Sequence, residues 1–302
     1  MPGGGWVHRY PRHVSATLIV VAVVTAGAAA LRSTWSPCGW SMLSTITPLT
    51  ERARGHRFGV TAAWFVAGSS LGGMLPGLIG AGLAVVIGWV GLSATGIWSL
   101  LLVGALAAAA LDAGRVGPAL PHHRRQVSEV WVDEFRPWVY GSGFGVQIGC
   151  GLATYIMTGA VYLTALLAGL VGAANGLVGA LAIGVFFGFS RGLAVLLGAV
   201  ITTPARLVGF HRRFDAAGEP VRLAVIAVEV VLALISASAA FGSPGVVTAA
   251  TGVLGVAGMI AAPTVVRVIG RQRGRSPMVM PASAPLSTAV STDRREKDPM
   301  TA

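Results

Sequence analysis

Two cysteines, Cys38 and Cys150, have the most distinctive chemistry in this sequence. Cys38 follows a serine and a proline near the end of the first apolar segment, and Cys150 stands between two glycines in an apolar segment of the second half. Such a pair could form and break one disulfide bond by reversible attack of a thiolate on a disulfide. Cysteine is also a small apolar residue that packs well. The sequence leaves both interpretations open.

Two charged residues inside apolar segments, Arg191 and Glu229, are the other candidates for chemistry. A central arginine costs about 2.5–3.5 kcal/mol on membrane-insertion scales, so it is expected to have a partner or a function. Glu229 is the natural partner of Arg191, and the two could form a static buried pair. Alternatively, Arg191 binds an anion or stabilises a nearby thiolate. Arg32, at the end of the first apolar run, is expected to snorkel to the membrane surface.

Membrane-spanning helices must position these residues. The chain is 54% hydrophobic and 11% charged, with a mean hydropathy of +0.73, whereas about 25% of residues are charged in an average soluble domain. Helices satisfy their own backbone hydrogen bonds inside a hydrocarbon core of ~30 Å. We therefore predict an all-α, polytopic membrane protein with about seven spans, within a range of six to nine. The predicted cores are 15–35 (or 15–49 with a break at Pro37), 58–87, 93–112, 138–167, 174–208, 221–240 and 245–266.

The loops between these spans predict the orientation. Arginine-rich loops alternate with uncharged loops, and basic loops stay on the cytoplasmic side. We predict a multi-pass plasma-membrane protein with a cytoplasmic C-terminus. The net charge of +11 then reflects topology and an anionic inner leaflet, so we expect the lipid bilayer and no nucleic acid as a partner. The basic regions are 50–57, 113–137, 209–222 and the tail after 266, and the uncharged loops are 88–92, 168–173 and 241–244.

The first apolar run, Ser15 to Leu31, admits three interpretations. It resembles a signal peptide, because Arg9 and Arg12 precede it and small residues end it, and cleavage would leave Cys38 near an outer N-terminus. If the run is retained and crosses alone, segment 36–49 must return as a short second pass. We favour the third arrangement, a single helix broken at Pro37, because proline removes a backbone donor and clashes with the preceding turn.

We predict an inverted repeat, in which three spans are followed by a basic loop and three more spans. Because each half has an odd number of spans, the two halves have opposite orientations. In such repeats the functional groups lie near the membrane midplane, where broken helices meet. In the second half only glycines could interrupt the corresponding helix. Glycines at four-residue spacing, as at Gly184 and Gly188, are expected mainly to let helices pack closely. The predicted domains are an N-terminal segment (1–14), a first half (15–112), a cytoplasmic amphipathic loop (113–137), a second half (138–240), an additional transmembrane helix (241–270) and a disordered cytoplasmic tail (271–302).

Several classes of site are not expected. All six histidines fall in termini or predicted loops, which argues against paired haem ligands in the membrane. No CxxC, HExxH, Walker or GxSxG pattern occurs in a usable context. We therefore expect neither a metal nor a cofactor.

The Ser36-Pro37-Cys38 motif, the cysteine in the fourth span and the three-plus-three layout resemble the CcdA/DsbD family, the cytochrome c biogenesis transmembrane region. The resemblance covers the layout of about residues 15–240. It implies thiol–disulfide exchange by Cys38 and Cys150, so any enzyme activity would be that of a thiol–disulfide oxidoreductase. Electron transfer would run from cytoplasmic thioredoxin to an extracytoplasmic thiol protein. Where the family has further prolines, this chain has Ser41 with Met42, and glycines on both sides of Cys150.

A secondary transporter is the alternative. Inverted repeats, glycine-broken helices and an intramembrane Arg–Glu pair also suit export of a small anion, which would make the chain similar to proteins of the TauE/SafE type. The cysteines would then be packing residues and Arg191 would contact the substrate. A membrane scaffold without a substrate is a third reading. A carrier needs both thiols, whereas a transporter tolerates serine at positions 38 and 150.

Overall fold

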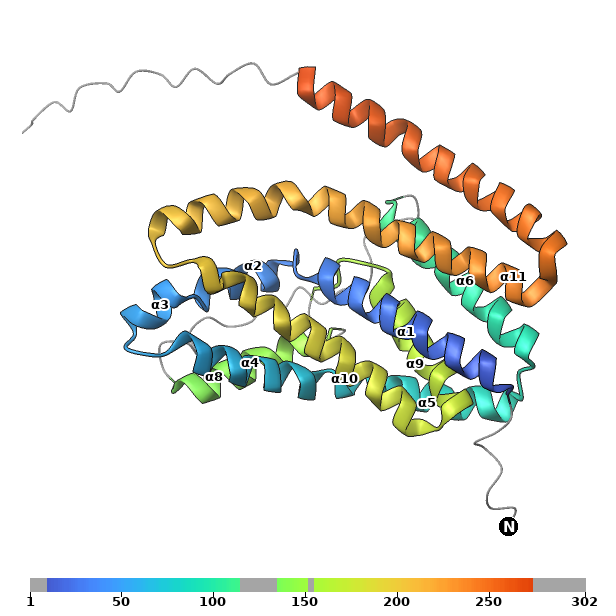
Figure 1. The fold of residues 1–302 in the computed structure, drawn as a ribbon, viewed down its shortest axis with the longest axis horizontal. Helices are drawn as coiled ribbons and strands as arrows, with labels where there is room; N and C mark the ends of the chain where they lie inside the picture. The colour runs from blue at the N-terminus through green and yellow to red at the C-terminus, as the bar shows by residue number, and fades with distance from the viewer. Residues whose placement is uncertain (1–9, 115–134, 152–154, 274–302) are drawn as a thin grey trace, which may run out of the picture. The chain divides into compact units, whose positions relative to one another are not determined.

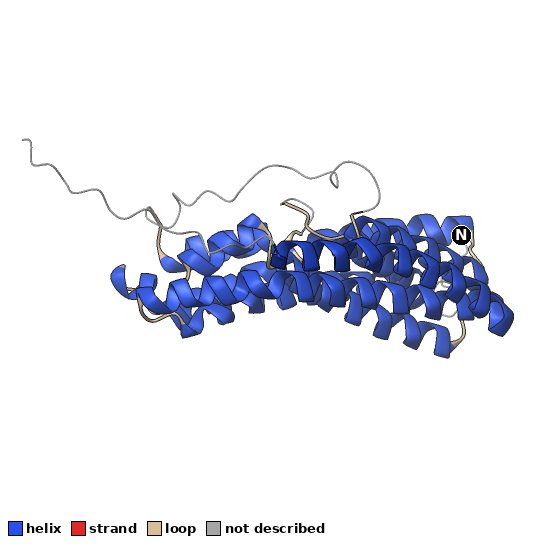
Figure 2. Ribbon diagram, turned by 90° about the horizontal axis from the view of Figure 1, so that it is seen from above, coloured by secondary structure: helices blue, strands red, loops and turns tan. Residues whose placement is uncertain are grey.

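The computed structural model describes residues 10–114, 135–151 and 155–273, with side chains described up to residue 242. These residues form helices and no strand (Figure 2). Five helical segments within them are long and apolar enough to cross a membrane, and Ala160–Asn175 is apolar but shorter. A multi-pass helical membrane protein is thereby confirmed, while the number of seven spans stays a prediction. The five segments are Arg12–Ser33, Phe58–Val90, Ala94–Asp112, Leu177–Val200 and Pro204–Gly242.

The first apolar segment is broken between residues 33 and 37. Thr34 ends α1, Ser36 caps α2 by accepting a hydrogen bond from the Gly39 N–H (3.2 Å), and Pro37 is the first residue of α2. A Cβ at Gly39 would lie 2.0 Å from the Thr34 carbonyl oxygen, so the tight turn requires glycine there. The helices of the first half, labelled in Figure 1, are α1 (Arg12–Ser33), α2 (Pro37–Thr45), α3 (Pro48–Ala53), α4 (Phe58–Gly72), α5 (Met74–Val90) and α6 (Ala94–Asp112).

The second half also begins with a broken helix. The prediction of one continuous core over 138–167 is wrong, because α8 ends at Gly149 and α9 begins at Ala160. Gly151 adopts a φ of +63°, a left-handed conformation that glycine accommodates without strain. The elements of this half are α8 (Pro137–Gly149), α9 (Ala160–Asn175), α10 (Leu177–Leu193), the 3₁₀ helix η1 (Ala194–Val200) and α11 (Pro204–Arg273).

Two further boundaries differ from the prediction, and a third agrees with it. The predicted loop 209–222 is helical, since α11 begins at Pro204 and runs through it. The predicted loop 168–173 lies inside α9, and the turn falls instead at Gly176, whose φ is +88°. The predicted loop 241–244 contains Gly242, which interrupts α11 with φ +74° and ψ −173°.

Parts of the predicted domains lie outside the described residues. These are residues 1–9 of the N-terminal segment, 115–134 of the predicted amphipathic loop and 274–302 of the predicted tail. Contacts between Cα atoms divide the chain into residues 1–260 and 261–302, and the described part of the second unit is helical backbone up to Arg273.

Glycines bring α4, α8 and α10 into backbone contact (Figure 1). A Cβ at Gly149 of α8 would lie 2.0 Å from the Ser69 carbonyl oxygen of α4, and a Cβ at Gly188 of α10 would lie 2.2 Å from the same oxygen. The Ser69 hydroxyl donates to the Gly188 carbonyl at 2.7 Å. These glycines therefore allow close helix packing, which is the role predicted for them.

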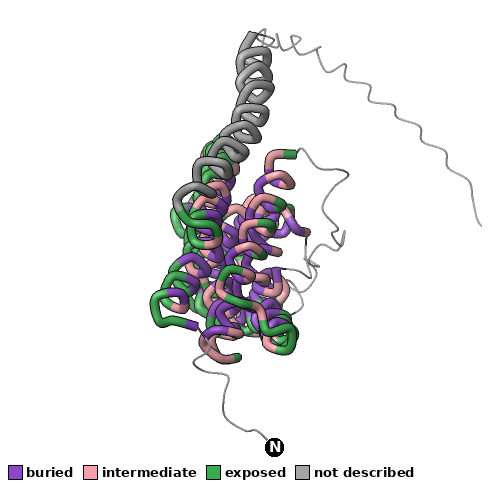
Figure 3. The backbone as a smooth tube through the Cα atoms, turned by 90° about the vertical axis from the view of Figure 1, so that its right-hand side faces the viewer, coloured by how far each residue is buried: buried purple, intermediate pink, exposed green. Residues whose placement is uncertain are grey.

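The buried residues, coloured purple along the backbone in Figure 3, form two apolar clusters. The larger cluster combines residues of α1, α6, α9 and α10 with part of α11, and includes Phe187. The smaller cluster combines α2, α4 and α8 with Phe214 of α11, and includes Cys38. The two breaks bring the chain from one cluster to the other.

We predict that Gly149→Ala destabilises the protein. The added Cβ would overlap the Ser69 carbonyl, and overpacking of this kind costs about 1–3 kcal/mol or more. The matched control is Gly82→Ala, an exposed glycine of α5 with no atom within 4 Å of an added Cβ. The thermal unfolding midpoint in detergent should fall for Gly149→Ala and not for Gly82→Ala. Equal midpoints would contradict the packing described.

Candidate functional site

Cys38 lies at the N-terminal end of α2, directly after the first break. It is the second residue of the helix and is 2% exposed. The cap of Ser36 and the turn allowed by Gly39 therefore fix the position of the sulfur within the smaller apolar cluster.

Cys150 lies at the second break, where it ends α8. It is half-buried, and its backbone N–H still donates to the Val146 carbonyl at 3.0 Å. Gly151 then turns the chain out of the helix, and a Cβ at this glycine would lie 2.6 Å from the Phe187 ring. Both cysteines are free thiols in the structure.

Arg191 connects the two cysteines. Its guanidinium interacts electrostatically with the thiols of both Cys38 and Cys150. The side chain is 2% exposed, and none of its three side-chain nitrogens has a hydrogen-bond partner among the described residues. The chain thus brings two thiols from different halves to one buried, unpartnered cation.

The predicted pair of Arg191 and Glu229 is not formed. Neither side chain has a hydrogen-bond partner among the described residues, and Glu229 interacts electrostatically with Asp112 instead. Arg191 lies near the end of α10 beside the two breaks, whereas Glu229 lies on the face of α11 that is packed into the bundle. The two intramembrane charges therefore belong to different sites.

Aromatic residues of the first break, α2 and α11 cover the Cys38 side of the site. The Trp35 ring stacks on the Phe214 ring with centroids 4.3 Å apart, and its indole N–H donates to the Phe214 carbonyl at 2.8 Å. Trp40 meets Phe214 edge-on at 5.1 Å. Ser44 and His211 share a hydrogen bond of 3.1 Å. Residues 209–222, which we predicted to be a loop, are part of α11, and Phe214 of this segment packs at the site.

A buried polar cluster around Glu51 escaped the sequence analysis. Glu51 is fully buried and pairs with Arg54 at 3.4 Å. The single O–H of Tyr140 is shared between the two Glu51 carboxylate oxygens (2.8 and 2.7 Å), and the Thr61 hydroxyl donates to the same carboxylate at 2.5 Å. These contacts join α3, α4 and α8 near the predicted cytoplasmic loop 50–57. An acidic residue in an otherwise basic loop was the available signal.

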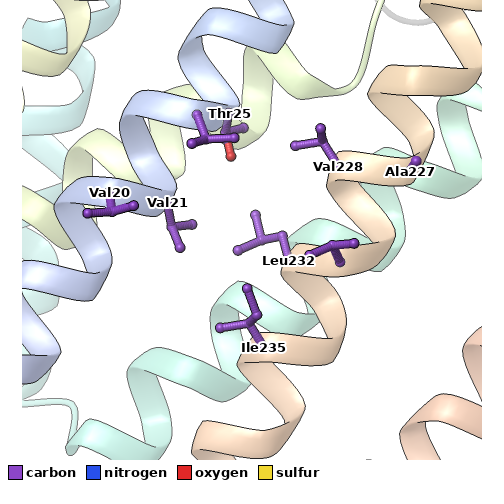
Figure 4. Close-up of a pocket in the computed structure, with 9 residues that line it drawn as sticks. Val20, Val21, Thr25, Ala227, Val228, Leu232 and Ile235 are labelled. Carbon is purple, nitrogen blue, oxygen red and sulfur yellow. The ribbon is translucent and has the colours of Figure 1, made fainter.

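Two other features place limits on the site. The described residues contain no group of three or more histidine, cysteine or acidic side chains that could hold a metal ion. A pocket of about 390 Å³ lies between α1 and α11, with Val20, Val24, Val228 and Ile235 among its lining residues (Figure 4). Its only polar lining residue is Thr25, so it does not resemble a site for a charged substrate.

Comparison with known proteins finds relatives that share one name. The chain is similar to the methylamine utilization protein MauF of Paracoccus denitrificans, with 36% identity over 189 residues, which cover 59% of this chain and 64% of that protein. MauF of Paracoccus versutus is 33% identical over 155 residues (49% and 55%), and MauF of Methylobacillus flagellatus is 30% identical over 169 residues (54% and 58%). The matched region thus spans less than two thirds of each relative.

No family model matches the chain, and no solved structure matches it. The relatives are named MauF and not CcdA or DsbD. The resemblance to those carriers is therefore supported only as far as a helical membrane protein, and its chemistry remains a proposal.

We predict that Tyr140→Phe destabilises the protein more than Ser142→Ala in the same helix. Loss of the Tyr140 hydroxyl removes the donor that both oxygens of the buried Glu51 carboxylate share, and leaving a buried polar group undersatisfied costs about 1–3 kcal/mol. The Ser142 hydroxyl only bonds back to the carbonyls of Trp138 and Val139 in its own helix. Thermal unfolding in detergent compares the two variants, and an equal effect would show that the Glu51 cluster contributes little.

Proposed function

We propose that this chain is a membrane thiol–disulfide carrier in which Cys38 and Cys150 form and break one disulfide bond beside Arg191. The observation that carries the proposal is their convergence on a single buried guanidinium. An arginine without a partner is costly inside a membrane. Neutral thiols leave that charge uncompensated, whereas a thiolate would compensate it. The arrangement is therefore suited to a reaction that passes through a thiolate.

The exchange proceeds in two steps in this proposal. A thiolate of a cytoplasmic dithiol such as thioredoxin attacks one sulfur of the Cys38–Cys150 disulfide, which forms a mixed disulfide and releases the other cysteine as a thiolate. The partner's second thiolate then attacks the mixed disulfide, and the partner leaves as a disulfide. Two electrons and two protons pass from the partner dithiol to Cys38 and Cys150. Reduction of an extracytoplasmic disulfide by the same two steps returns the pair to its oxidised form.

The two broken helices support access from both sides. We propose that they are equivalent parts of an inverted repeat, in which α1–α2 corresponds to α8–α9. The packing agrees with this correspondence, because α10 packs against α1 and η1 against α2, as α4 packs against α8 and α5 against α9. Each cysteine then stands at the break of its own half, where backbone outside a regular helix can move most readily.

The relatives supply a biological setting for the proposal. They are named methylamine utilization proteins, and we propose that this chain also serves methylamine utilization. The substrate of the carrier would then be an extracytoplasmic thiol protein required for that process.

Export of a small anion is the second candidate function. The same unpartnered guanidinium of Arg191 favours it, because a buried cation in a membrane protein can bind an anionic substrate. In that case the cysteines pack beside the site without reacting. The two functions differ in whether the thiols are needed.

The first test of the proposal is thiol trapping in native membranes. We expect Cys38 and Cys150 to form a disulfide under oxidant, detected as a mass shift after alkylation before and after reduction, and we expect cytoplasmic thioredoxin to open it. Single variants Cys38→Ser and Cys150→Ser should each abolish the disulfide. Thiols that remain free under oxidant would overturn the carrier function. Anion export that persists in the double serine variant would then establish the alternative.

A second test uses two substitutions of Arg191. Arg191→Gln removes the charge, and we expect it to slow alkylation of Cys150 about tenfold, which corresponds to about 1.4 kcal/mol of lost thiolate stabilisation. Arg191→Lys keeps a positive charge and should retain most of the reactivity. Alkylation rates are measured in folded protein, with fully unfolded protein as the reference. Equal rates in wild type and Arg191→Gln would show that the guanidinium does not act on the thiol.

A further inference from the structure

A second buried polar site lies where α6, α9 and α11 meet. The Asp112 carboxylate, at the end of α6, accepts hydrogen bonds from the Thr158 hydroxyl and from the Gly159 N–H (2.5 Å). Arg222 of α11 donates to the Asp112 carbonyl at 2.8 Å and pairs with Glu219 at 2.6 Å. Arg32, at the end of α1, interacts electrostatically with Asp112 and Arg222.

Glu229 faces this site from within the membrane. It lies seven residues after Arg222 on α11, which corresponds to two helical turns and the same helix face. It is fully buried, neither carboxyl oxygen has a hydrogen-bond partner among the described residues, and it interacts electrostatically with Asp112. An ionised carboxylate in this position would have neither a counter-ion nor a hydrogen-bond donor.

The charges of the site balance without Glu229. Arg32 and Arg222 carry two positive charges, and Asp112 and Glu219 carry two negative charges. Ionisation of Glu229 would add a third negative charge inside an apolar bundle. A buried acid in such surroundings takes up a proton, because the neutral form avoids the desolvation of an unpaired charge.

We propose that Glu229 is the proton-binding residue of a membrane-embedded site that it shares with Asp112. Asp112 accepts hydrogen bonds from Thr158 and Gly159 and interacts electrostatically with Arg32 and Arg222, while Glu229 takes up and releases a single proton. Buried acidic residues of this kind form the proton relays of pumps and transporters. The site would let a carrier or an exporter couple its cycle to proton movement. The proposal does not depend on the chemistry of Cys38 and Cys150.

Infrared difference spectroscopy of the full chain in lipid tests this site. We expect the carbonyl band of a protonated carboxyl group at neutral pH, its loss in alkaline buffer, and its absence at all pH values in Glu229→Gln. Asp215→Asn is the matched control, because it removes an exposed acid of α11 that is not part of the site and should leave the band unchanged. Glu229→Asp should restore a titrating band. An unchanged elution profile in size-exclusion chromatography establishes that each variant is folded.

Three results would overturn the proposal. The first is the absence of a protonated carboxyl band in wild type at neutral pH. The second is a band that survives in Glu229→Gln, which would assign the proton to another acid. The third is loss of the band on addition of sodium ions at constant pH, which would indicate a cation site. The same spectra recorded in the Cys38→Ser, Cys150→Ser protein separate this test from the carrier function.

Discussion

Backbone contact between α4, α8 and α10 at Ser69 is the constraint on which the rest of the structure depends. Gly149, Gly188 and Gly192 come from two different helices, and an added Cβ on each would lie within 3 Å of Ser69. Gly188 and Gly192 flank Arg191 on α10, and Gly149 precedes Cys150. The contact that sets the helix spacing therefore also sets the positions of the cation and of one thiol. Any side chain larger than hydrogen at these positions would move the site.

Arg191 and Glu229 both lack a hydrogen-bond partner among the described residues, and the two side chains do not pair with each other. Arg191 is an uncompensated cation beside two neutral thiols, and Glu229 is an additional acid beside a site whose charges already balance. If they formed an ion pair, each would compensate the other, and neither would be available to bind another group. In our proposals each charge is instead compensated reversibly. A thiolate or an anion compensates Arg191, and a bound proton neutralises Glu229. A static buried ion pair would offer neither binding event.

The helical membrane architecture could be predicted from composition and apolar runs, because hydrocarbon solvent leaves the backbone few options. The break after residue 33 had a visible cause in Pro37. The break after Gly149 was harder to predict, since glycine permits an interruption without imposing one. Residues 209–222 were assigned to a loop because of their charge, yet arginine and glutamate are good helix formers, and α11 simply extends beyond the apolar region.

The partners of the charged residues could not be predicted, because partnership depends on the rotation of each helix about its axis. Arg191 and Glu229 were paired in the sequence analysis as the two charges inside apolar segments. In the structure Glu229 interacts electrostatically with Asp112, which was not considered as a partner of the intramembrane charges. Glu51 was overlooked for a similar reason, since its hydrogen-bond donors Thr61 and Tyr140 come from two other helices.

In the proposed carrier, the unequal burial of the two thiols determines which sulfur a partner attacks first. Cys38 is 2% exposed and lies in the apolar cluster that contains Phe214, whereas Cys150 is only half-buried. A partner thiolate approaching this conformation meets Cys150 first, and Cys38 becomes the leaving sulfur. Departure of Cys38 as a thiolate at the N-terminus of α2 is favoured by the helix dipole and by Arg191. Phe214, on which Trp35 stacks, belongs to the same apolar cluster as Cys38, so in this proposal exposure of Cys38 to a second partner requires that cluster to open.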